Sequence, residues 1–381
     1  MNESKATRYQ RARRRTRAAG LVSAGLVLAL IALTPAARLL ANAARSASAG
    51  ATGLAATTLS LAIFVFLLVV VWELATLPAM IYMARRVERA YQARTALSIE
   101  EVLGAQASAS IVALPAAMIV GMTVILAVAV SGRWWWMAAG LLLACFLAIA
   151  LHGAPTVFAW LADVRPLARA ELAARLRQLA VHAGVPIAGI DEWVVGGNAS
   201  ATALVIGVGR VRRVLVSSEI ARQWTDDEVA VVVAHELAHH AYRDLWTSLA
   251  LDVLVLSTSL LIANLAVVRL TGALAISGPA DLAALPLIAL VAGAVWTLAT
   301  PLRHALSRRH ERRADVFALA LTDRAEAFGA AIRRLGARHL SEERPSAMTR
   351  WLYYRHPSVS ERLALADAYQ RARPAARSER L

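Results

Sequence analysis

Residues 225–239 read TDDEVAVVVAHELAH, and this stretch predicts a helix that ends in a metal site. Thr225 and Glu228 have the spacing of a capping box, which starts a helix by bonding its first free amide groups. The acidic residues between them lie at the positive end of the helix dipole, and the valines that follow supply a buried face. His235 and His239 are four residues apart, so both imidazoles leave the helix on one side and can share a metal ion.

A third ligand is expected on a second helix, at Glu311 in the segment SRRHERRAD, residues 307–315. Two imidazoles and one carboxylate leave one position of a tetrahedral zinc ion open, as in hydrolytic zinc sites. Glu236 lies one residue beyond His235 and is placed to reach a water molecule activated by the metal rather than the ion itself. The alternative is a helix whose histidines are incidental. The capping box and the buried face favour the metal site.

The chain is too apolar for an ordinary soluble enzyme, with 58% hydrophobic side chains in 381 residues. A helix needs roughly 20 apolar residues to cross a bilayer. We expect six spans, near 19–41, 54–83, 108–131, 134–160, 247–268 and 282–302. Glu73 and Asp252 lie within two of them, where a carboxylate either faces the interior of the bundle or lies near the membrane surface.

Arginine is distributed unevenly between the expected loops, and this predicts an orientation. The net charge of the chain is +15. The N-terminus, the second loop and the regions after spans four and six are rich in arginine, whereas residues 42–53, 132–133 and 269–281 hold one arginine each. This positive-inside pattern places both termini in the cytoplasm. Anionic lipid of the inner leaflet, rather than nucleic acid, is the expected partner of these arginines.

The outer side is expected to be simple. The Ala/Ser-rich residues 42–58 predict a loose external loop, and the three tryptophans at 134–136 predict an aromatic belt. A basic start before an apolar run that reaches residues 34–37 also fits a cleaved signal peptide. The basic region is long and the apolar run continues beyond the cleavage point, which favours a retained anchor.

The expected topology brings the two halves of the predicted site to one depth. Span five begins about eight residues after His239, and span six ends about nine residues before Glu311. At 1.5 Å per helical residue, both lie roughly 12–14 Å beyond the membrane on the cytoplasmic side. A two-span hairpin therefore returns the third ligand to the first two.

Several neighbours of the ligands have a predicted supporting role. Asp315 is four residues after Glu311 and shares its helix face, so its carboxylate can accept the free N–H of a liganding histidine and fix the tautomer. Pairing with a nearby arginine is the alternative. Asp244, just beyond the first helix, has the same two interpretations. His240 and His310 point about 100° away from the ligands beside them, which predicts pocket or surface positions.

The polar segment 163–246 lies between spans four and five. We expect a helix at 165–183 and short strands at 192–195, 201–206 and 212–216. A strand edge beside a zinc helix suits peptide binding by strand addition, because backbone hydrogen bonds hold many sequences in one register. The alternative is a plain packing hairpin.

The chain resembles the integral-membrane gluzincin peptidases, which include the CAAX prenyl endopeptidase (type I) and its HtpX-like bacterial relatives. The resemblance rests on HELAH at 235–239 with Asp244, on residues 307–315, on Asn198-Ala199, on residues 207–215, and on His356-Pro357 with Arg362. It extends more weakly to residues 77–103. Two features depart from the family: the number of spans before the metal helix, and the sequence SSEI at 217–220 in place of an acidic residue followed by Leu. They concern the substrate and the shape of the chamber rather than the metal site.

The resemblance implies one zinc ion per chain and a substrate strand beside residues 198–206. It implies that Asn198 and His356 hold the substrate or stabilise the oxyanion. From position alone, His356 is a candidate donor to the oxyanion if the tail folds over the metal. By role, the zinc ligands are His235, His239 and Glu311, the catalytic residues are Glu236, His356 and Asn198, and the supporting residues are Asp315, Asp244 and Arg362.

These observations predict an all-α polytopic membrane protein of about six transmembrane helices with a small α+β cytoplasmic zinc-metalloprotease domain. A basic N-terminus and four spans would occupy 1–162, the short sheet and zinc helix 163–246, the two-span hairpin 247–302, and the helical region with the third ligand and the His-Pro motif 303–381.

The expected function is that of a zinc metalloendopeptidase that cuts peptides or membrane proteins at the cytoplasmic face of the plasma membrane, with membrane-protein quality control as the expected process. CAAX-type processing of lipidated peptides and a non-catalytic zinc-containing membrane binding protein are the alternatives. A transporter or channel is suggested by span number alone, and the sequence lacks the internal repeat typical of transporters.

Overall fold

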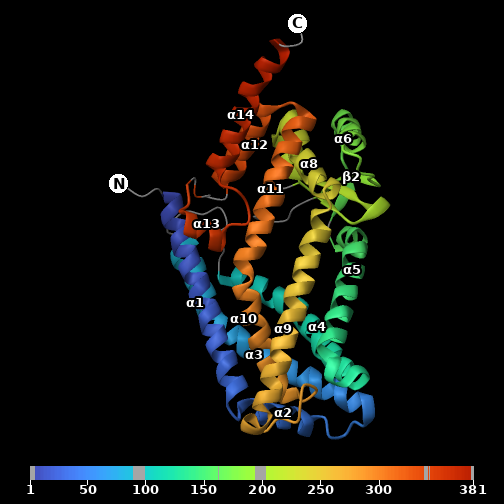
Figure 1. Cartoon of the computed structure of the whole chain (residues 1–381), viewed down its shortest axis with the longest axis vertical. Coiled ribbons are helices and arrows are strands. Elements are labelled where there is room, and N and C mark those ends of the chain that lie inside the picture. The colour runs from blue at the N-terminus through green and yellow to red at the C-terminus, as the bar shows by residue number, and fades with distance from the viewer. Residues whose placement is uncertain are drawn as a thin grey trace. The chain divides into compact units, whose positions relative to one another are not determined.

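The computed structural model describes residues 5–88, 99–161, 163–193, 203–338, 342 and 344–378. The chain forms two compact units, whose elements are labelled in Figure 1. We call Arg8–Phe146 with Asp252–Ala299 the apolar unit, and Met1–Thr7 with Leu147–Leu251 and Thr300–Leu381 the mixed unit. The expected division into four parts stays a prediction; segments 163–246 and 303–381 fall in the same compact unit.

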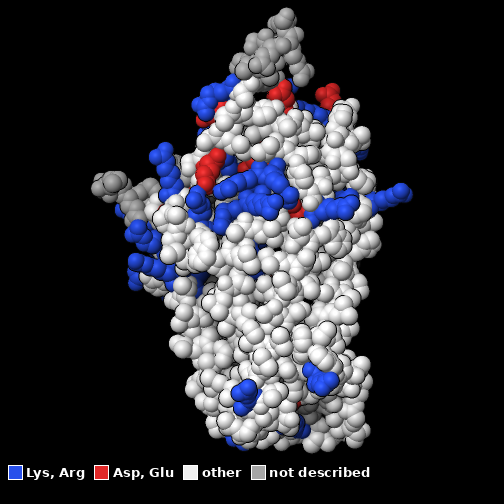
Figure 2. Space-filling view, in the orientation of Figure 1, with Lys and Arg blue, Asp and Glu red and all other residues white. Residues whose placement is uncertain are grey.

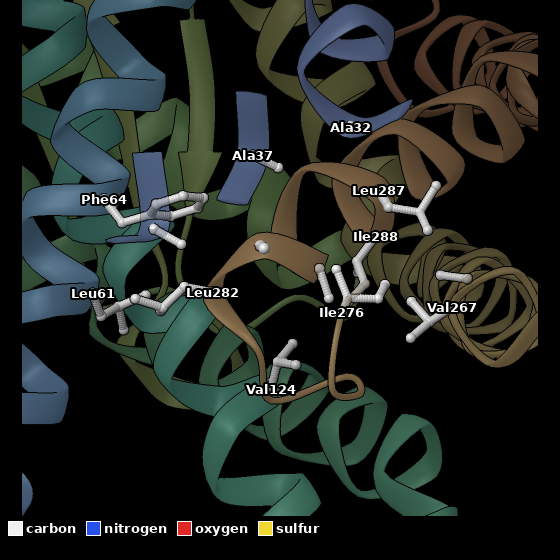
Figure 3. Packing of buried hydrophobic residues seen from close by; sticks show 14 of the residues in the cluster. Ala32, Ala37, Leu61, Phe64, Val124, Val267, Ile276, Leu282, Leu287 and Ile288 are labelled. Atoms are coloured by element: carbon white, nitrogen blue, oxygen red, sulfur yellow. The ribbon is translucent and has the colours of Figure 1, made fainter. Parts of the chain in front are cut away.

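Long helices make up the apolar unit. They are α1 (Lys5–Leu33), α2 (Ala36–Ala47), α3 (Gly53–Tyr82) with a π-helical end at Met83–Glu88, α4 (Ile99–Ser131), the start of α5 (Trp135–Leu161), most of α9 (Asp244–Leu274), and α10 (Leu285–Leu298) after a 3-10 turn at Leu282–Ala284. Figure 3 shows its core, where Leu61 and Phe64 of α3 lie near Leu282. Val124 of α4 and Leu287 of α10 belong to the same cluster.

The outer faces of these helices are apolar as well. Leu26, Ile111 and Val130 are 66%, 71% and 86% exposed. Most of the surface of this unit in Figure 2 carries no charged side chain. Monomeric soluble proteins rarely expose apolar areas this large, so this surface fits lipid rather than water.

In the part of the chain that the structure describes, four helices are long and apolar enough to cross a membrane, or up to five if α10 and α11 (Thr300–Thr322) form one bent span. The four are Lys5–Leu33, Gly53–Val87, Gln106–Val157 and Asp244–Leu274. Gln106–Val157 has 52 residues, about 78 Å of helix, against a hydrocarbon core of roughly 30 Å. It is long enough for the two spans expected at 108–131 and 134–160. The count of six stays a prediction.

Two of the expected spans are not continuous helices in the structure. The first, 19–41, ends at Leu33, because Pro35 cannot donate to the helix and α2 starts in a new segment at Ala36. The loose loop expected at 42–58 was therefore wrong in part, since α2 continues to Ala47 and α3 begins at Gly53. The last span, 282–302, is divided at Ala299, where α10 and α11 meet at a bend of 46°.

Polar groups in the apolar unit find partners inside it. Glu73 accepts hydrogen bonds from Gln106 and from Ser110 Oγ, the latter at 2.9 Å, so its carboxylate faces α4. The belt expected at 134–136 was wrong for Trp135, which is 1% exposed and donates to Asn264 at 2.7 Å. Trp134 is 51% exposed, as an interfacial residue would be.

The mixed unit contains a four-stranded sheet of β1 (Val164–Pro166), β2 (Gly189–Trp193), β4 (Arg213–Ser217) and β3 (Ala203–Ile206), in that order. β2 and β4 are parallel, and the outer pairs β1–β2 and β3–β4 are antiparallel. Among the described strands, this order leaves β3 at an edge. β1 was not expected. Because it occupies the start of the helix predicted at 165–183, that helix, α6, begins later and spans Ala170–His182.

Helices complete the mixed unit. They are α7 (Ser218–Gln223), α8 (Asp226–Ala241), α11, α12 (Ala325–Arg338), α13 (Ala347–Tyr353) and α14 (Val359–Ser378). Thr225 and Glu228 form the predicted capping box at the start of α8. Val229, Val233 and Leu237 of α8 are fully buried in a core shared with the sheet and α6. This packing fixes the α8 face that carries the histidines.

Candidate metal centre

Three side chains from two helices converge in the mixed unit. His235 and His239 of α8 and Glu311 of α11 each offer a ligand atom, and these atoms lie within 4.8 Å of one another. His235 Nε2 is 3.3 Å from one oxygen of Glu311, and His239 Nε2 is 3.6 Å from the other. The two imidazole rings meet edge to face, 5.0 Å apart. The structure therefore brings together the three predicted ligands.

The second nitrogen of His235 is held by a buried carboxylate. His235 Nδ1 is 2.9 Å from Asp315, which is 1% exposed. Asp315 in turn accepts two hydrogen bonds from Arg362 of α14, one of them at 2.9 Å. The guanidinium also lies 5.7 Å from the ring centre of Phe328. We call His235, Asp315 and Arg362 the distant relay, because its members come from three helices.

The second nitrogen of His239 is held in the same manner. His239 Nδ1 is 2.9 Å from Asp244, the first residue of α9, which is 4% exposed. Arg313 of α11 donates to the other oxygen of Asp244 and stacks on Tyr242, 4.8 Å from its ring centre. We call His239, Asp244 and Arg313 the local relay, because its first two members lie five residues apart. Both aspartates take the predicted supporting position.

These donors fit a metal cation. With each Nδ1 held by an aspartate, each Nε2 is directed to Glu311. Burial alone lowers the pKa of His235, but hydrogen bonds to Asp315 and Glu311 outweigh it and raise that pKa to about 9. Positive charge is thus stabilised at this point of the structure. Two imidazoles and a carboxylate are the ligand set that zinc prefers in hydrolytic sites.

Glu236 lies beside the ligand set without belonging to it. It borders two hollows, and Glu311 borders both as well. Burial raises the pKa of Glu236 above its usual range, which the two histidines oppose. A carboxyl group with a raised pKa accepts a proton and returns it more readily at neutral pH than an exposed one.

The two hollows differ in size and lining. The larger, about 370 Å³, is bordered by the end of β3, by His239, His240 and His310, and by apolar residues of α5 such as Leu151. The smaller, about 140 Å³, is bordered by apolar residues of α8 and α12, among them Phe328 and Ile332, and by His356 and Arg362. Glu236 therefore borders open space in two separate hollows.

The sequence profile of peptidase family M48 matches residues 166–370, more than half of the chain. The chain belongs to peptidase family M48. The matched range contains every residue of both relays and all three candidate ligands. The family assignment and the geometry therefore concern the same part of the molecule.

Individual relatives agree with M48 membership. An uncharacterized metalloprotease of Bacillus subtilis (strain 168), YhfN, is 28% identical over 244 residues, which are 62% of this chain and 57% of that protein. The match thus spans little more than half of the relative. The crystal structure of S. mikatae Ste24p superposes with a TM-score of 0.69 at 18% identity, covering 85% of this chain and 79% of that one, which shows a likeness of fold.

The remaining predicted residues of this M48 chain have different outcomes. His356 Nδ1 lies 2.8 Å from Glu311, with a side chain 64% exposed, so the tail does reach the site. Asn198 lies outside the described residues. His240 and His310 both border the larger hollow. Arg313 was predicted only as one of four arginines, at 308–313, that could pair with an aspartate, because nothing in the pattern distinguishes it from the others.

Proposed function

We propose that the chain is a membrane zinc metalloendopeptidase that hydrolyses peptide bonds of protein or peptide substrates at the cytoplasmic membrane face. One observation carries this proposal: His235, His239 and Glu311 present three donors within 4.8 Å of one another, while Glu236, outside that set, borders both hollows. A closed structural zinc site has no need for such a carboxylate.

Zinc held by the three donors would supply a Lewis acid that polarises the scissile carbonyl and acidifies a water molecule. Glu236 takes a proton from that water and later delivers it to the leaving amine. Burial keeps its pKa raised, which suits both transfers. His356, beside Glu311 and exposed to the smaller hollow, is placed to donate to the developing oxyanion.

On the side of β3 that faces away from β4, no strand is paired among the described residues, and this supports an extended substrate. β3 pairs with β4 on one side, and Val205, Ile206 and Gly207 border the larger hollow together with Glu236. A peptide added to this edge would be held through its backbone, with little demand on its sequence. That suits substrates of many sequences, as quality control of membrane proteins requires.

The distribution of charge supports the cytoplasmic assignment. In the apolar unit, the segments at 42–53, 132–133 and 269–281 hold one arginine each, and Arg45 pairs with Asp281 at 2.7 Å. Residues 303–313, in contrast, contain five arginines around the third candidate ligand. By the positive-inside rule, the poor segments face outward and the arginine-rich ones inward.

The decisive test compares three single variants of the full chain in detergent. Glu236→Gln should retain one zinc per chain and lose cleavage of casein, because the side chain keeps its size and loses its base. Glu311→Ala should lose the zinc itself. Glu326→Gln, on the exposed side of α12, serves as the matched control and should behave as wild type. Cleavage that persists in Glu236→Gln at full zinc content would disprove the assigned role.

Substrates are then found by trapping. Membrane proteins that remain bound to Glu236→Gln, compared with those bound to wild type in the same host, should include misfolded membrane proteins if quality control is the process. Recovery of lipid-modified peptides instead would assign the chain to CAAX-type processing. Zinc bound with no cleavage and no trapped protein would favour a non-catalytic binding protein.

A further inference from the structure

The end of β3 is tied to the helix that carries the candidate ligands. His240, the residue after His239, has its Nε2 3.1 Å from the carbonyl oxygen of Val205. Arg212, in the turn between β3 and β4, donates from Nε to His240 Nδ1 at 3.1 Å. The same guanidinium donates to the carbonyl of Gly209 at 2.9 Å. Two side chains thus join the strand, its turn and α8.

The hydrogen bonds also fix the state of the imidazole. Arg212 can only donate, so His240 Nδ1 must accept. In a neutral imidazole the other nitrogen then carries the hydrogen, and Nε2 donates to Val205. Both hydrogen bonds, from Arg212 to His240 and from His240 to Val205, therefore have one defined donor and one defined acceptor. A single tautomer satisfies both contacts.

The turn after β3 is constrained independently. Gly207 has a φ of +87°, a conformation that favours glycine. A Cβ at this position would lie 2.5 Å from Pro155 Cγ and 3.2 Å from the carbonyl of Val211. The close approach of Pro155 and the bond from His240 hold the strand end from two directions.

The contacts of Arg212 and His240 with the end of β3, which we call the bridge, lie beside the candidate metal centre. β3 is an edge strand of the described sheet, and its residues Val205 and Ile206 border the larger hollow. Gly207, His240, Glu236 and Glu311 border the same hollow. Because His240 follows His239 directly on α8, a movement of β3 relative to the candidate ligands must break or carry along this bond. The position of β3 is therefore fixed relative to the candidate metal ligands on α8, and not only by its pairing with the sheet.

We infer that His240 and Arg212 are positioning residues that fix edge strand β3 against the metal helix and thereby set the register of the peptide to be cut. This inference rests on the proposed function. His240 contacts the carbonyl of Val205, which borders the larger hollow. The bridge thus sets where the edge lies relative to the candidate metal ligands.

Register matters because strand pairing repeats every two residues. A peptide that slips along β3 by one repeat presents a different peptide bond to Glu236. Loss of the bridge should leave binding possible but place the scissile bond less accurately. A misplacement of about 1 Å can cost on the order of 100-fold in rate.

The test uses the full chain in detergent with casein as the probe, and mass spectrometry to identify each cleavage site. His240→Phe keeps a ring and removes both hydrogen bonds. It should lower kcat about tenfold or more with a KM within about threefold of wild type, and should spread cleavage to neighbouring bonds. Arg212→Gln leaves α8 unchanged but no longer forces His240 Nδ1 to accept a hydrogen bond. It should spread cleavage to neighbouring bonds to a smaller degree than His240→Phe.

Conservative and distant variants provide the controls. His240→Gln retains one donor and one acceptor and should restore the wild-type cleavage sites. His182→Phe, at an exposed position of α6, and Arg210→Gln, in the same turn as Arg212, should match wild type. Zinc content and thermal unfolding identify any variant that has lost its fold, and Arg212→Gln then carries the test.

The outcomes separate the two proposals. Cleavage by wild type but not by Glu236→Gln, with sites and kcat unchanged in folded His240→Phe and Arg212→Gln, would overturn the positioning role and leave the peptidase intact. Spread sites in both variants, restored by His240→Gln, would establish it. Absence of cleavage by zinc-loaded wild type would overturn both proposals.

Discussion

The distant and the local relay perform the same task from different material. In each, an aspartate holds the Nδ1 of a candidate zinc histidine, and an arginine stacked on an aromatic ring holds the aspartate. The local relay takes His239 and Asp244 from one stretch of chain, with Arg243 at a φ of +57° forming the corner between them. The distant relay requires α8, α11 and α14 to pack together.

The two relays also differ in exposure. The side chains of Asp315 and Arg362 are 1% and 15% exposed, whereas those of Asp244 and Arg313 are 5% and 38% exposed. A buried charge that loses its partner cannot be compensated by water, while a partly exposed one can. The distant relay should therefore be the more sensitive half of the centre, although its contacts have the same chemistry.

The largest expected effect comes from removing the aspartates. Asp315→Ala leaves Arg362 buried without its acceptor and frees His235, so zinc affinity should fall by about 100-fold and the fold should lose about 3–5 kcal/mol. Asp244→Ala should weaken zinc by about tenfold, because Arg313 can turn to solvent. Zinc titration against a chelator and thermal unfolding measure both. Equal losses in the two variants would show that burial does not distinguish the relays.

Replacement of the two arginines should lower stability by less than removal of the aspartates does, and again more in the distant relay than in the local one. Arg362→Gln removes charge-assisted hydrogen bonds from a fully buried carboxylate and should destabilise the protein by about 2–3 kcal/mol. Arg313→Gln should cost about 1 kcal/mol, since its pair is partly exposed and His239 still holds Asp244. Thermal unfolding of the zinc-loaded proteins provides the comparison. A larger loss for Arg313→Gln would reverse the proposed ranking.

The smallest expected effect concerns the start of α14, the helix that carries Arg362 of the distant relay. Ser358 and Glu361 cap the start of that helix, with Ser358 N–H donating to Glu361 at 2.8 Å, and Glu361 also pairs with Arg350. Burial raises the pKa of Glu361, but the bonds from Ser358 and the charge of Arg350 outweigh it and leave the pKa lowered. The stabilisation is thus complete above the ordinary glutamate pKa of about 4.3 and is lost as the pH falls through the lower folded value.

Glu361→Gln should therefore cost about 1 kcal/mol at pH 7, as loss of a helix cap does. The difference from wild type should shrink as the pH falls below the ordinary glutamate pKa of about 4.3, and should vanish once the pH lies below the lowered pKa of the folded protein. Thermal unfolding of both proteins across this range measures it. Zinc affinity should decline slightly through Arg362, whereas the contact of His239 with Asp244 should stay unchanged. A difference between the two proteins that persists unchanged into acid would contradict the assigned pKa shift.

What the sequence predicted follows the same division between local and distant contacts. The capping box, the α8 helix and the shared face of His235 and His239 depend on residues within fifteen positions, and helical periodicity places them. The supporting positions of Asp315 and Asp244 were predicted because each lies four or five residues from a ligand, whereas Glu311 was predicted from its own segment and from the depth to which the two-span hairpin returns it. Periodicity determines contacts at this range.

Other contacts had no local pattern to indicate them. Arg313 contacts Asp244 across 69 residues, and Arg212 contacts His240 across 28. Such pairs depend on how helices and strands pack, which composition and spacing leave undetermined. The break at Pro35 and the buried position of Trp135 were missed for a related reason: hydropathy identifies an apolar stretch and does not show where it bends or which face packs inward.

The separation of the distant relay along the chain has a consequence for biosynthesis. Arg362 lies 127 residues beyond His235. At ordinary rates of synthesis, the ribosome needs roughly 6 to 25 seconds to make that interval. During this time a nascent chain carries both histidines without the arginine that holds Asp315. The distant relay is therefore completed later in synthesis than the local relay, whose last member, Arg313, precedes Arg362 by 49 residues.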